Sequence, residues 1–303
     1  MRYSRYGIRM SSVAVILLGM ASTLNGQPRD EDLAFDRPEA WAMRYFTAAG
    51  LMQGSLPPSR LGKGQFALGF DVANVPTLSK SERTVGFNGT KEENMNKAPL
   101  IARPLVHYGL SDRFSLTAAY VPPVEIFDRL KTHLAGLFVN VQAVRSDRFM
   151  VGVRLGGQWS EARGDFTCAA DIAGVMDPEI NPFGCVEPSN DTFTSLTATA
   201  EAWVDYRLRT TLPADLFLSV AYSYADLEFD VNALWQGGFR DQRRLSTSGE
   251  IWSFSGGVNV TLSDKLSASL AIVHVPLDVR RPPEFSLETN SLTHFRLSVN
   301  LLL

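Results

Sequence analysis

The sequence predicts an all-β protein, an up-and-down antiparallel transmembrane β-barrel of about ten strands. A short turn motif recurs between alternating segments, at Ser111-Asp112-Arg113-Phe114, Ser146-Asp147-Arg148-Phe149 and Ser263-Asp264-Lys265-Leu266. Ser and Asp bond the local backbone in tight turns, so the repeat indicates a repeated hairpin unit. Beyond residue 26, no stretch approaches the roughly eighteen apolar residues that a membrane-spanning helix needs. A membrane form of this chain must therefore be a closed barrel, which satisfies its own backbone in hydrocarbon.

Residues 1–26 have the order of a secretory signal peptide. Three basic residues, Arg2, Arg5 and Arg9, precede an apolar run from Val13 to Ala21, and small and polar residues follow. Such a segment is removed on export, so it is left out of the fold. No Cys follows it closely enough to take a lipid, which argues against a lipoprotein.

The composition excludes one class of partner and agrees with an exported barrel. A formal charge of -3 argues against nucleic acid, whose binders usually carry a basic excess. A mean hydropathy of -0.03 is average in bulk, as expected when apolar residues occupy every second position of a strand. The two cysteines, Cys168 and Cys185, fit an oxidising compartment, and we expect them to form a disulfide.

Alternation along the chain places the strands. Phe149, Val151 and Val153 share one face of a segment, while Arg154 and Gln158 lie on the other. Strands of about nine to eleven residues with this two-residue period are the signature of a membrane barrel. The expected strands are residues 64–75, 97–109, 113–122, 132–144, 148–160, 192–209, 214–228, 249–262, 265–276 and 290–303.

The connections between these strands predict how the barrel sits in its membrane. Four tight turns near residues 111, 146, 211 and 263 fall on one side. The longer connections fall on the other side, at residues 76–96, 123–131, 161–191, 229–248 and 277–289. Short periplasmic turns and longer external loops are the usual asymmetry, and an even strand count places both ends of the barrel on the periplasmic side.

Two parts of the chain depart from the simple pattern. Pro104 lies inside an expected strand, where it has no N–H for the ladder, so a bulge or a local break is expected there. Residues 27–63 form either a periplasmic extension or a plug, with a helix opening at Pro38, or an extra hairpin before Pro57-Pro58. A helix leaves ten strands in the barrel, residues 64–303, whereas a hairpin would give twelve.

These features together resemble bacterial outer-membrane β-barrel proteins, including the porin-like and small hydrophobic-solute transporter families. The resemblance covers residues 64–303 and is carried by the signal peptide, the alternating strands, the turn asymmetry and the terminal strand. It implies export through the periplasm to the bacterial outer membrane, with outer-membrane lipids and the barrel-assembly machinery as partners. The terminal strand of such proteins resembles a signal for that machinery and usually ends in an aromatic residue, whereas this chain ends in Leu303.

A belt of charged side chains is expected inside the barrel at mid-height. These candidates for lining the lumen are Asp71, Arg103, Arg154, Glu201, Asp205 and Arg296. They either brace the wall as a mutually neutralised network or form a constriction that selects solutes. A barrel of about ten strands is only slightly wider than the eight-stranded kind that side chains fill, so free diffusion of large solutes is not expected.

The predicted function is a narrow channel or binding barrel for a small solute. The alternative is a closed structural or surface-interaction barrel that acts through its external loops. An outer-membrane lipid enzyme is a distant third, resting on the outward-facing His274, for which no adjacent strand offers an obvious Ser partner. We therefore expect no catalytic residues, no metal site and no cofactor.

Overall fold

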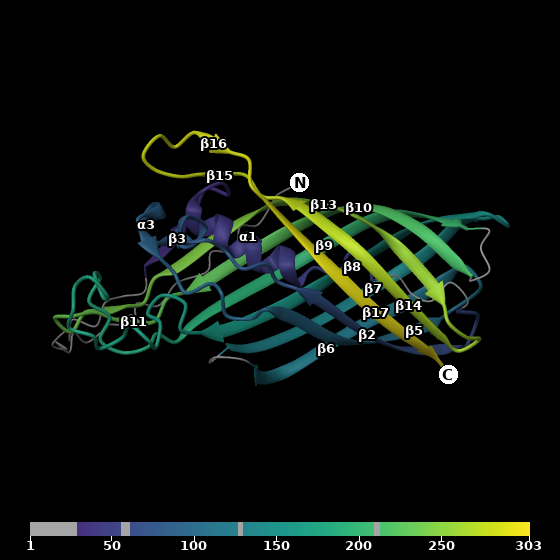
Figure 1. The fold of residues 1–303 in the computed structure, drawn as a ribbon, viewed down its shortest axis with the longest axis horizontal. Helices are drawn as coiled ribbons and strands as arrows, with labels where there is room; N and C mark the ends of the chain where they lie inside the picture. The colour runs from purple at the N-terminus through teal and green to yellow at the C-terminus, as the bar shows by residue number, and fades with distance from the viewer. Residues whose placement is uncertain (1–28, 56–60, 127–129, 209–212) are drawn as a thin grey trace, which may run out of the picture.

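The structure is a computed structural model that describes residues 29–55, 61–126, 130–208 and 213–303. The expected signal peptide lies outside the described residues. Within them, ten long strands form one closed antiparallel barrel (Figure 1). These strands are β2 (Phe66–Asn74), β5 (Leu100–Gly109), β6 (Phe114–Ile126), β7 (Leu130–Arg145), β8 (Phe149–Gly164), β9 (Asp191–Arg207), β10 (Ala214–Asp230), β13 (Arg244–Thr261), β14 (Leu266–Pro276) and β17 (Ser291–Leu302).

Each long strand pairs with its neighbours in chain order, and the last strand closes on the first. Leu297 of β17 lies opposite Val72 of β2, and Val258 of β13 lies opposite Leu270 of β14. The ten-stranded, up-and-down prediction is confirmed. The twelve-stranded alternative is wrong, because residues 38–50 form a helix instead of one arm of a hairpin.

The tight turns form one end of the barrel, which we call the turn end, and the long connections form the other, the loop end. At the turn end, the hydroxyls of Ser111, Ser146 and Ser263 each accept hydrogen bonds from the amides two and three residues later, at 3.1–3.4 Å. This local bonding is the reason the Ser-Asp motif closes a hairpin. The fourth turn falls on residues 209–212, outside the described residues.

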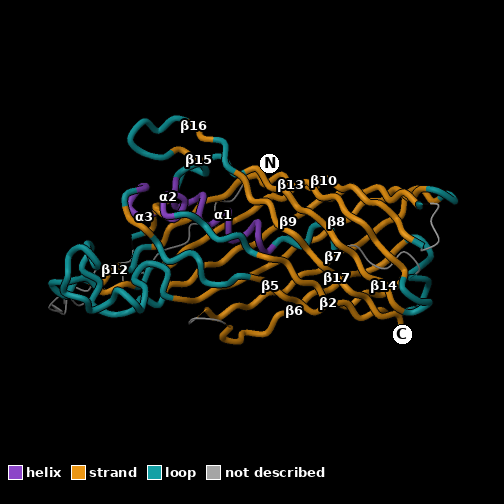
Figure 2. The backbone as a smooth tube through the Cα atoms, viewed as in Figure 1, coloured by secondary structure: helices purple, strands orange, loops and turns teal. Residues whose placement is uncertain are grey.

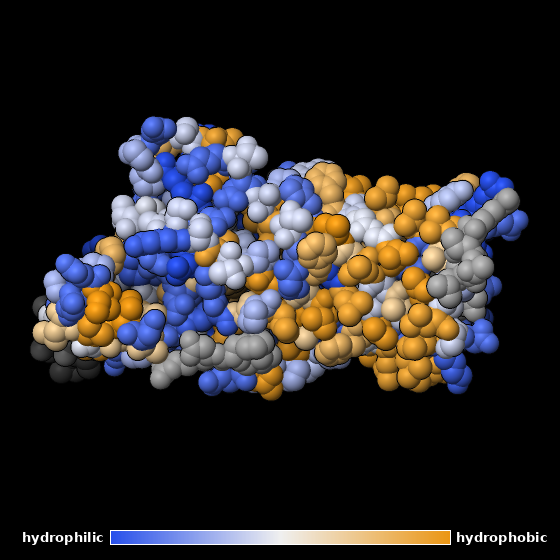
Figure 3. Space-filling view, in the orientation of Figure 1, coloured by the Kyte–Doolittle hydropathy of each residue, from blue (hydrophilic) through white to orange (hydrophobic). Residues whose placement is uncertain are grey.

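The outer surface carries an apolar band. Outward side chains such as Phe70 and Leu218 are exposed by 51% and 65%. The residues that alternate with them along the same strands point into the barrel and are mostly buried. On the face seen in Figure 3, this band covers the half of the barrel nearest the turns, with polar residues toward the loop end. An exposed apolar surface of this extent is typical of a barrel surrounded by lipid.

Aromatic side chains border the band on its loop side. His133 packs edge-on between Tyr120 and Trp159, with ring centroids 5.6 and 4.8 Å away, and Tyr222 packs on Trp252 at 5.2 Å. Amphipathic rings prefer the boundary between hydrocarbon and headgroups, so this loop-side aromatic belt marks one edge of the membrane.

The segment before the barrel folds at the loop end. A short strand, β1 (Asp30–Asp32), pairs in parallel with Arg244–Ser246 of β13, and the helix α1 (Pro38–Gly50) follows. Proline at the first helical position fits the chain entering α1, since its missing N–H would have no partner there. None of the helices in the described ranges is long and apolar enough to cross a bilayer.

Short elements in the long connections cover the loop end (Figure 2). They are α2 (Lys80–Arg83), β3 (Thr84–Val85), α3 (Gly86–Gly89), β4 (Lys91–Glu92), β11 (Ala233–Leu234), β12 (Arg240–Asp241), β15 (Val279–Arg280) and β16 (Leu287–Glu288). Beneath them, α1 packs its buried side chains on inward residues of β9, β10, β13 and β14. The main apolar core of the protein therefore lies inside the loop-end half of the barrel.

Candidate functional site

The described residues before the barrel lie at the loop end, at mid-height inside the lumen and beside the first turn. β1 lies at the loop end, Arg103 of the barrel wall binds the carbonyl of Leu51 at 3.0 Å, and Gly64 donates to the carbonyl of Gly109 beside the first turn at 2.7 Å. Residues 29–55 therefore extend from the loop end to mid-height inside the barrel. We call these residues the plug segment.

Arginine side chains of the wall bind the carbonyl groups where α1 ends. Arg103 donates to the carbonyls of Gly50 and Leu51 at 2.6 and 3.0 Å, and Arg296 donates to the carbonyls of Leu51 at 2.6 Å and of Gln53. A helix leaves its last carbonyls without partners and carries partial negative charge at that end. Guanidinium groups suit both properties, so the wall binds the end of α1 directly.

Asp71 of β2 joins these two arginines to the plug segment. Its carboxylate lies 2.7 Å from Nε of Arg103 and 3.6 Å from Nε of Arg296, and it accepts hydrogen bonds from the hydroxyls of Ser55 and Ser298 at 3.0 Å each. All three charged side chains are almost completely buried. A buried carboxylate needs such partners, because burial without them is costly.

A second buried ion pair binds the same segment from the opposite wall. Arg154 of β8 lies 2.7 Å from Glu201 of β9 and donates to the carbonyls of Met52 and Ser55. Glu201 in turn accepts from the amide of Gly54 at 3.1 Å. Five of the six predicted lumen residues thus meet around residues 50–55, where three guanidinium groups face two carboxylates and several carbonyl oxygens.

Asp205, the sixth predicted residue, stands apart from this network. It lies four residues nearer the turn end of β9 than Glu201, is buried, and pairs in register with Phe217 and Met150. Among the described residues, its Oδ1 atom has no hydrogen-bond partner. The structure therefore brings together the candidates at mid-height but not the one nearest the turns.

An apolar cavity of about 180 Å³ lies between α1 and the wall on the loop side of the arginine network. Phe46 and Ala49 of α1 line one side, and Ile101, Val121 and Leu134 of the wall line the other. Its other lining residues include Leu100, Ala102, Leu130, Ala162, Phe166 and Phe193. The polar residues Lys97, Thr132, His133, Ser160 and Glu161 also line it. Most of the lining is apolar, so the cavity suits an apolar molecule.

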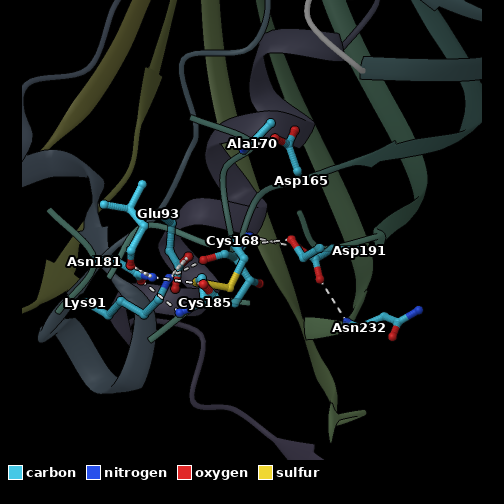
Figure 4. The surroundings of a disulfide bond; sticks show 12 residues. Lys91, Glu93, Asp165, Cys168, Ala170, Asn181, Cys185, Asp191 and Asn232 are labelled. Carbon is cyan, nitrogen blue, oxygen red and sulfur yellow. Dashed lines mark hydrogen bonds and ion pairs between the residues drawn. A yellow bond between two sulfur atoms is a disulfide. The ribbon is translucent and has the colours of Figure 1, made fainter. Parts of the chain in front are cut away.

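The long connection between β8 and β9 covers the loop end and contains the predicted disulfide. Cys168 and Cys185 are bonded, and Asn181 holds the second cysteine through its amide and carbonyl at 2.8 and 2.9 Å (Figure 4). Asp191 accepts from the amides of Thr167 and Asn232 at 2.7 and 2.8 Å. These bonds tie the connection together and join it to the neighbouring connection at Asn232.

The carboxyl group of Glu93 is buried beneath these external connections. Burial raises the pKa of Glu93 from 4.5 to about 8, against the opposing effect of the Lys91 ammonium 2.6 Å away. The buried Lys91 also donates to the backbone carbonyl of Thr167. Lys91 thus links Glu93 to the disulfide-bonded connection.

His107 and His274 make ordinary polar contacts. His107 is buried inside the barrel between Thr117 and Asn300, at 2.9 and 3.1 Å. His274 lies on the exposed outer face, where its Nδ1 atom is 2.8 Å from Oγ1 of Thr293. In the described ranges, no group of three or more His, Cys, Asp or Glu residues is arranged to hold a metal.

No protein-family model matches the sequence, and no curated protein matches it. Solved structures with a similar arrangement include the translocator domain of the autotransporter NalP from Neisseria meningitidis, at 12% identity and a TM-score of 0.48, covering 88% of this chain and 98% of that one. The outer membrane protease OMPT from Escherichia coli has 9% identity and a TM-score of 0.38, covering 79% and 94%. The toluene transporter TodX from Pseudomonas putida has 12% identity and a TM-score of 0.33, covering 80% and 69%.

The chain has the fold of outer-membrane β-barrel proteins. Its closed antiparallel barrel and apolar outer band are the observations that carry this statement. At such low identities and TM-scores, none of these structures transfers an activity to this chain. The function must be inferred from the lumen itself.

Sequence reasoning did not find the cavity or the residues of the plug segment that bind the arginines. The acceptors are backbone carbonyls of residues 50–55, which any amino acid provides, so the sequence carries no signal for them. The cavity depends on how α1 sits against the wall. The inward side chains of the wall were predictable, but their distance from α1 was not.

Proposed function

We propose that this protein is an outer-membrane barrel that binds a small apolar solute in the cavity beside α1, and that its lumen is not an open diffusion pore. The plug segment supports the second part, because it extends into the lumen and five buried charged side chains surround it at mid-height. Location in the bacterial outer membrane, with lipids around the apolar band, is part of the same proposal.

The apolar cavity is the observation that carries this proposal. At about 180 Å³ it is close in size to the apolar protein cavity of about 150 Å³ that stays dry and binds benzene. Ligand sites are typically concave and apolar with few polar groups, as this one is. A compact monoaromatic or a short-chain hydrocarbon fits both its size and its lining.

Filling the cavity tests the proposal. Leu134→Trp places a larger ring at the cavity wall, and Leu218→Trp places the same ring on the lipid-facing surface as the matched control. We expect fluorobenzene to bind the wild type and Leu218→Trp, measured by ¹⁹F NMR on protein in detergent, and not Leu134→Trp. Absence of binding to the wild type, or equal binding to both variants, would refute a site in this cavity.

A surface-interaction role through the external loops is the second candidate. Large apolar side chains stand out from the loop end, among them Met176 and Phe239, exposed by 84% and 61%. Isolated exposed apolar residues are common, but several together on ordered loops suit a contact surface. Replacing both residues by Ser should then reduce adherence of expressing cells to an apolar surface while leaving assembly and fluorobenzene binding unchanged.

A further inference from the structure

A second cavity lies beside the first half of α1, next to the cavity of the proposed function. It has a volume of about 70 Å³, and Ala42, Met43 and Phe46 of the helix line it. The larger cavity is lined by Phe46, Ala49 and Gly50 of the same helix. Residues spaced by three and four share one face of a helix. The two cavities therefore follow one another along one face of α1.

Three apolar side chains stand between these two cavities. Phe46, Met95 and Phe166 each line both of them. They come from α1, from the connection between β2 and β5, and from the disulfide-bonded connection. We call these three side chains the partition. Without it, the two cavities would form one longer space beside α1, so the partition sets the length of the larger cavity.

The partition belongs to a row of aromatic rings. The centroid of the Phe46 ring lies 5.5 Å from that of Phe166 and 5.9 Å from that of Phe193. The Phe166 centroid lies 6.0 Å from that of Phe229. Ring pairs at such separations attract one another beyond the burial of their surface. Of the two cavities, Phe193 lines the larger and Phe229 the smaller. The row thus crosses from one cavity to the other, and its two middle rings belong to the partition.

Both aromatic members of the partition are carried by segments that other parts of the protein bind. The carbonyl of Phe166 accepts from the amide of Asn94 at 2.8 Å, and the preceding residue, Asp165, forms a buried ion pair with Lys97. Phe46 lies on α1, whose last carbonyls bind arginine side chains of the wall. Moving either ring aside to enlarge the cavity would disturb these contacts.

We infer that the partition sets the upper size of the ligand, so that the larger cavity takes a compound with one aromatic ring and rejects one with two fused rings. The inference rests on the proposed function, because it assigns the size class of the ligand in that cavity. The cavity, about 180 Å³, is close in size to one that holds benzene. A second fused ring would need the space that Phe46 and Phe166 fill, and close-packed interiors resist such overpacking.

Removing one ring of the partition tests the inference. Phe166→Ala joins the two cavities, whereas the matched control, Phe229→Ala, removes a ring from the same row and leaves the partition in place. Binding of fluorobenzene and of 1-fluoronaphthalene is measured by ¹⁹F NMR on protein in detergent. The wild type and Phe229→Ala should bind 1-fluoronaphthalene about tenfold or more weakly than fluorobenzene. Phe166→Ala should bind it about tenfold or more tightly than the wild type does.

A second variant opens the same partition from the helix. Phe46→Ala places a good helix former in α1 and should give the same gain in 1-fluoronaphthalene binding, which Leu134→Trp in the same chain should abolish. Retained fluorobenzene binding shows that each partition variant is folded.

Three outcomes would overturn the inference while the binding site stands. They are equal binding of the two probes by the wild type, no gain in either partition variant, and an equal gain in Phe229→Ala. Failure of the wild type to bind fluorobenzene would instead refute the proposed function.

Discussion

The carboxylate of Asp71 and the guanidinium of Arg103 lie 2.7 Å apart inside the barrel, and both also bind the plug segment. Arg103 reaches the carbonyls at the end of α1, and Asp71 reaches the hydroxyl of Ser55. An ion pair that only braced the wall would have no need of these contacts. The pair therefore couples the barrel to the segment that fills it.

Removing Arg103 should release the plug segment. Arg103→Ala leaves Asp71 buried with fewer partners, and breaking a buried pair in this way costs about 3–5 kcal/mol. We expect the amides of α1 to exchange hydrogen faster and ion conductance to appear in planar bilayers. Arg207→Ala is the control, because Arg207 is 55% exposed at the turn end and 3.4 Å from Asp215. An Arg103→Ala protein that shows no ion conductance and no faster amide exchange in α1 would contradict this role.

Gly54 is required for the path of the plug segment through the network. Its φ of +72° lies in the left-handed region, and a Cβ atom there would come within 3.1 Å of Oγ of Ser255. Left-handed backbone costs a residue with a side chain about 1–2 kcal/mol. We expect Gly54→Ala to lower the melting temperature, as measured by circular dichroism of the protein in detergent.

Gly50→Ala is the matched control for that substitution. A Cβ at Gly50 meets its nearest neighbour at an ordinary 3.7 Å, and the residue ends a helix in which Ala is preferred to Gly. Its melting temperature should stay equal to that of the wild type or rise. Equal effects of the two substitutions would show that the backbone at Gly54 carries no special constraint.

The disulfide should stabilise the external cover and leave the barrel unaffected. Cys168 and Cys185 are 17 residues apart, a separation for which the loop-entropy model assigns roughly 3 kcal/mol. In Cys168→Ser/Cys185→Ser we expect faster proteolysis within residues 165–190 and unchanged heat-modifiable migration in gels. Loss of that migration would mean that the bridge is needed for barrel assembly as well.

Glu93 should make the stability of the loop end depend on pH. Its pKa is raised from 4.5 to about 8 in the folded protein, so its favourable contribution is complete below about pH 4.5 and is lost as pH rises through 8. The melting temperature of the wild type should therefore fall as the pH rises from 5 to 9, because the contribution of Glu93 is lost. Glu93→Gln should make the melting temperature depend less on pH over this range. An identical pH dependence in both proteins would contradict this role of Glu93.

Much of the barrel could be predicted because its signals are local. The two-residue period of Phe149, Val151 and Val153 reports which face meets lipid, and the hydroxyl of Ser146 closes its own turn. The inward direction of Arg103, Arg154 and Arg296 follows from the same period. What these arginines bind did not follow, because their partners are backbone carbonyls distant in the chain.

The sequence by itself determined the strands, their order, their inward and outward faces and the disulfide pair, since each depends on neighbouring residues or on a single possible pairing. Only the tertiary structure decided that residues 29–55 enter the lumen, that an apolar cavity remains beside α1, and that the β5–β6 ladder stops at Leu105 and Ala119. Pro104 was a local sign of that break. The bulge of β6 against β7 between Val121 and Val124 lies beside it. The cavity depends on the space between a helix and a wall that are far apart in the chain.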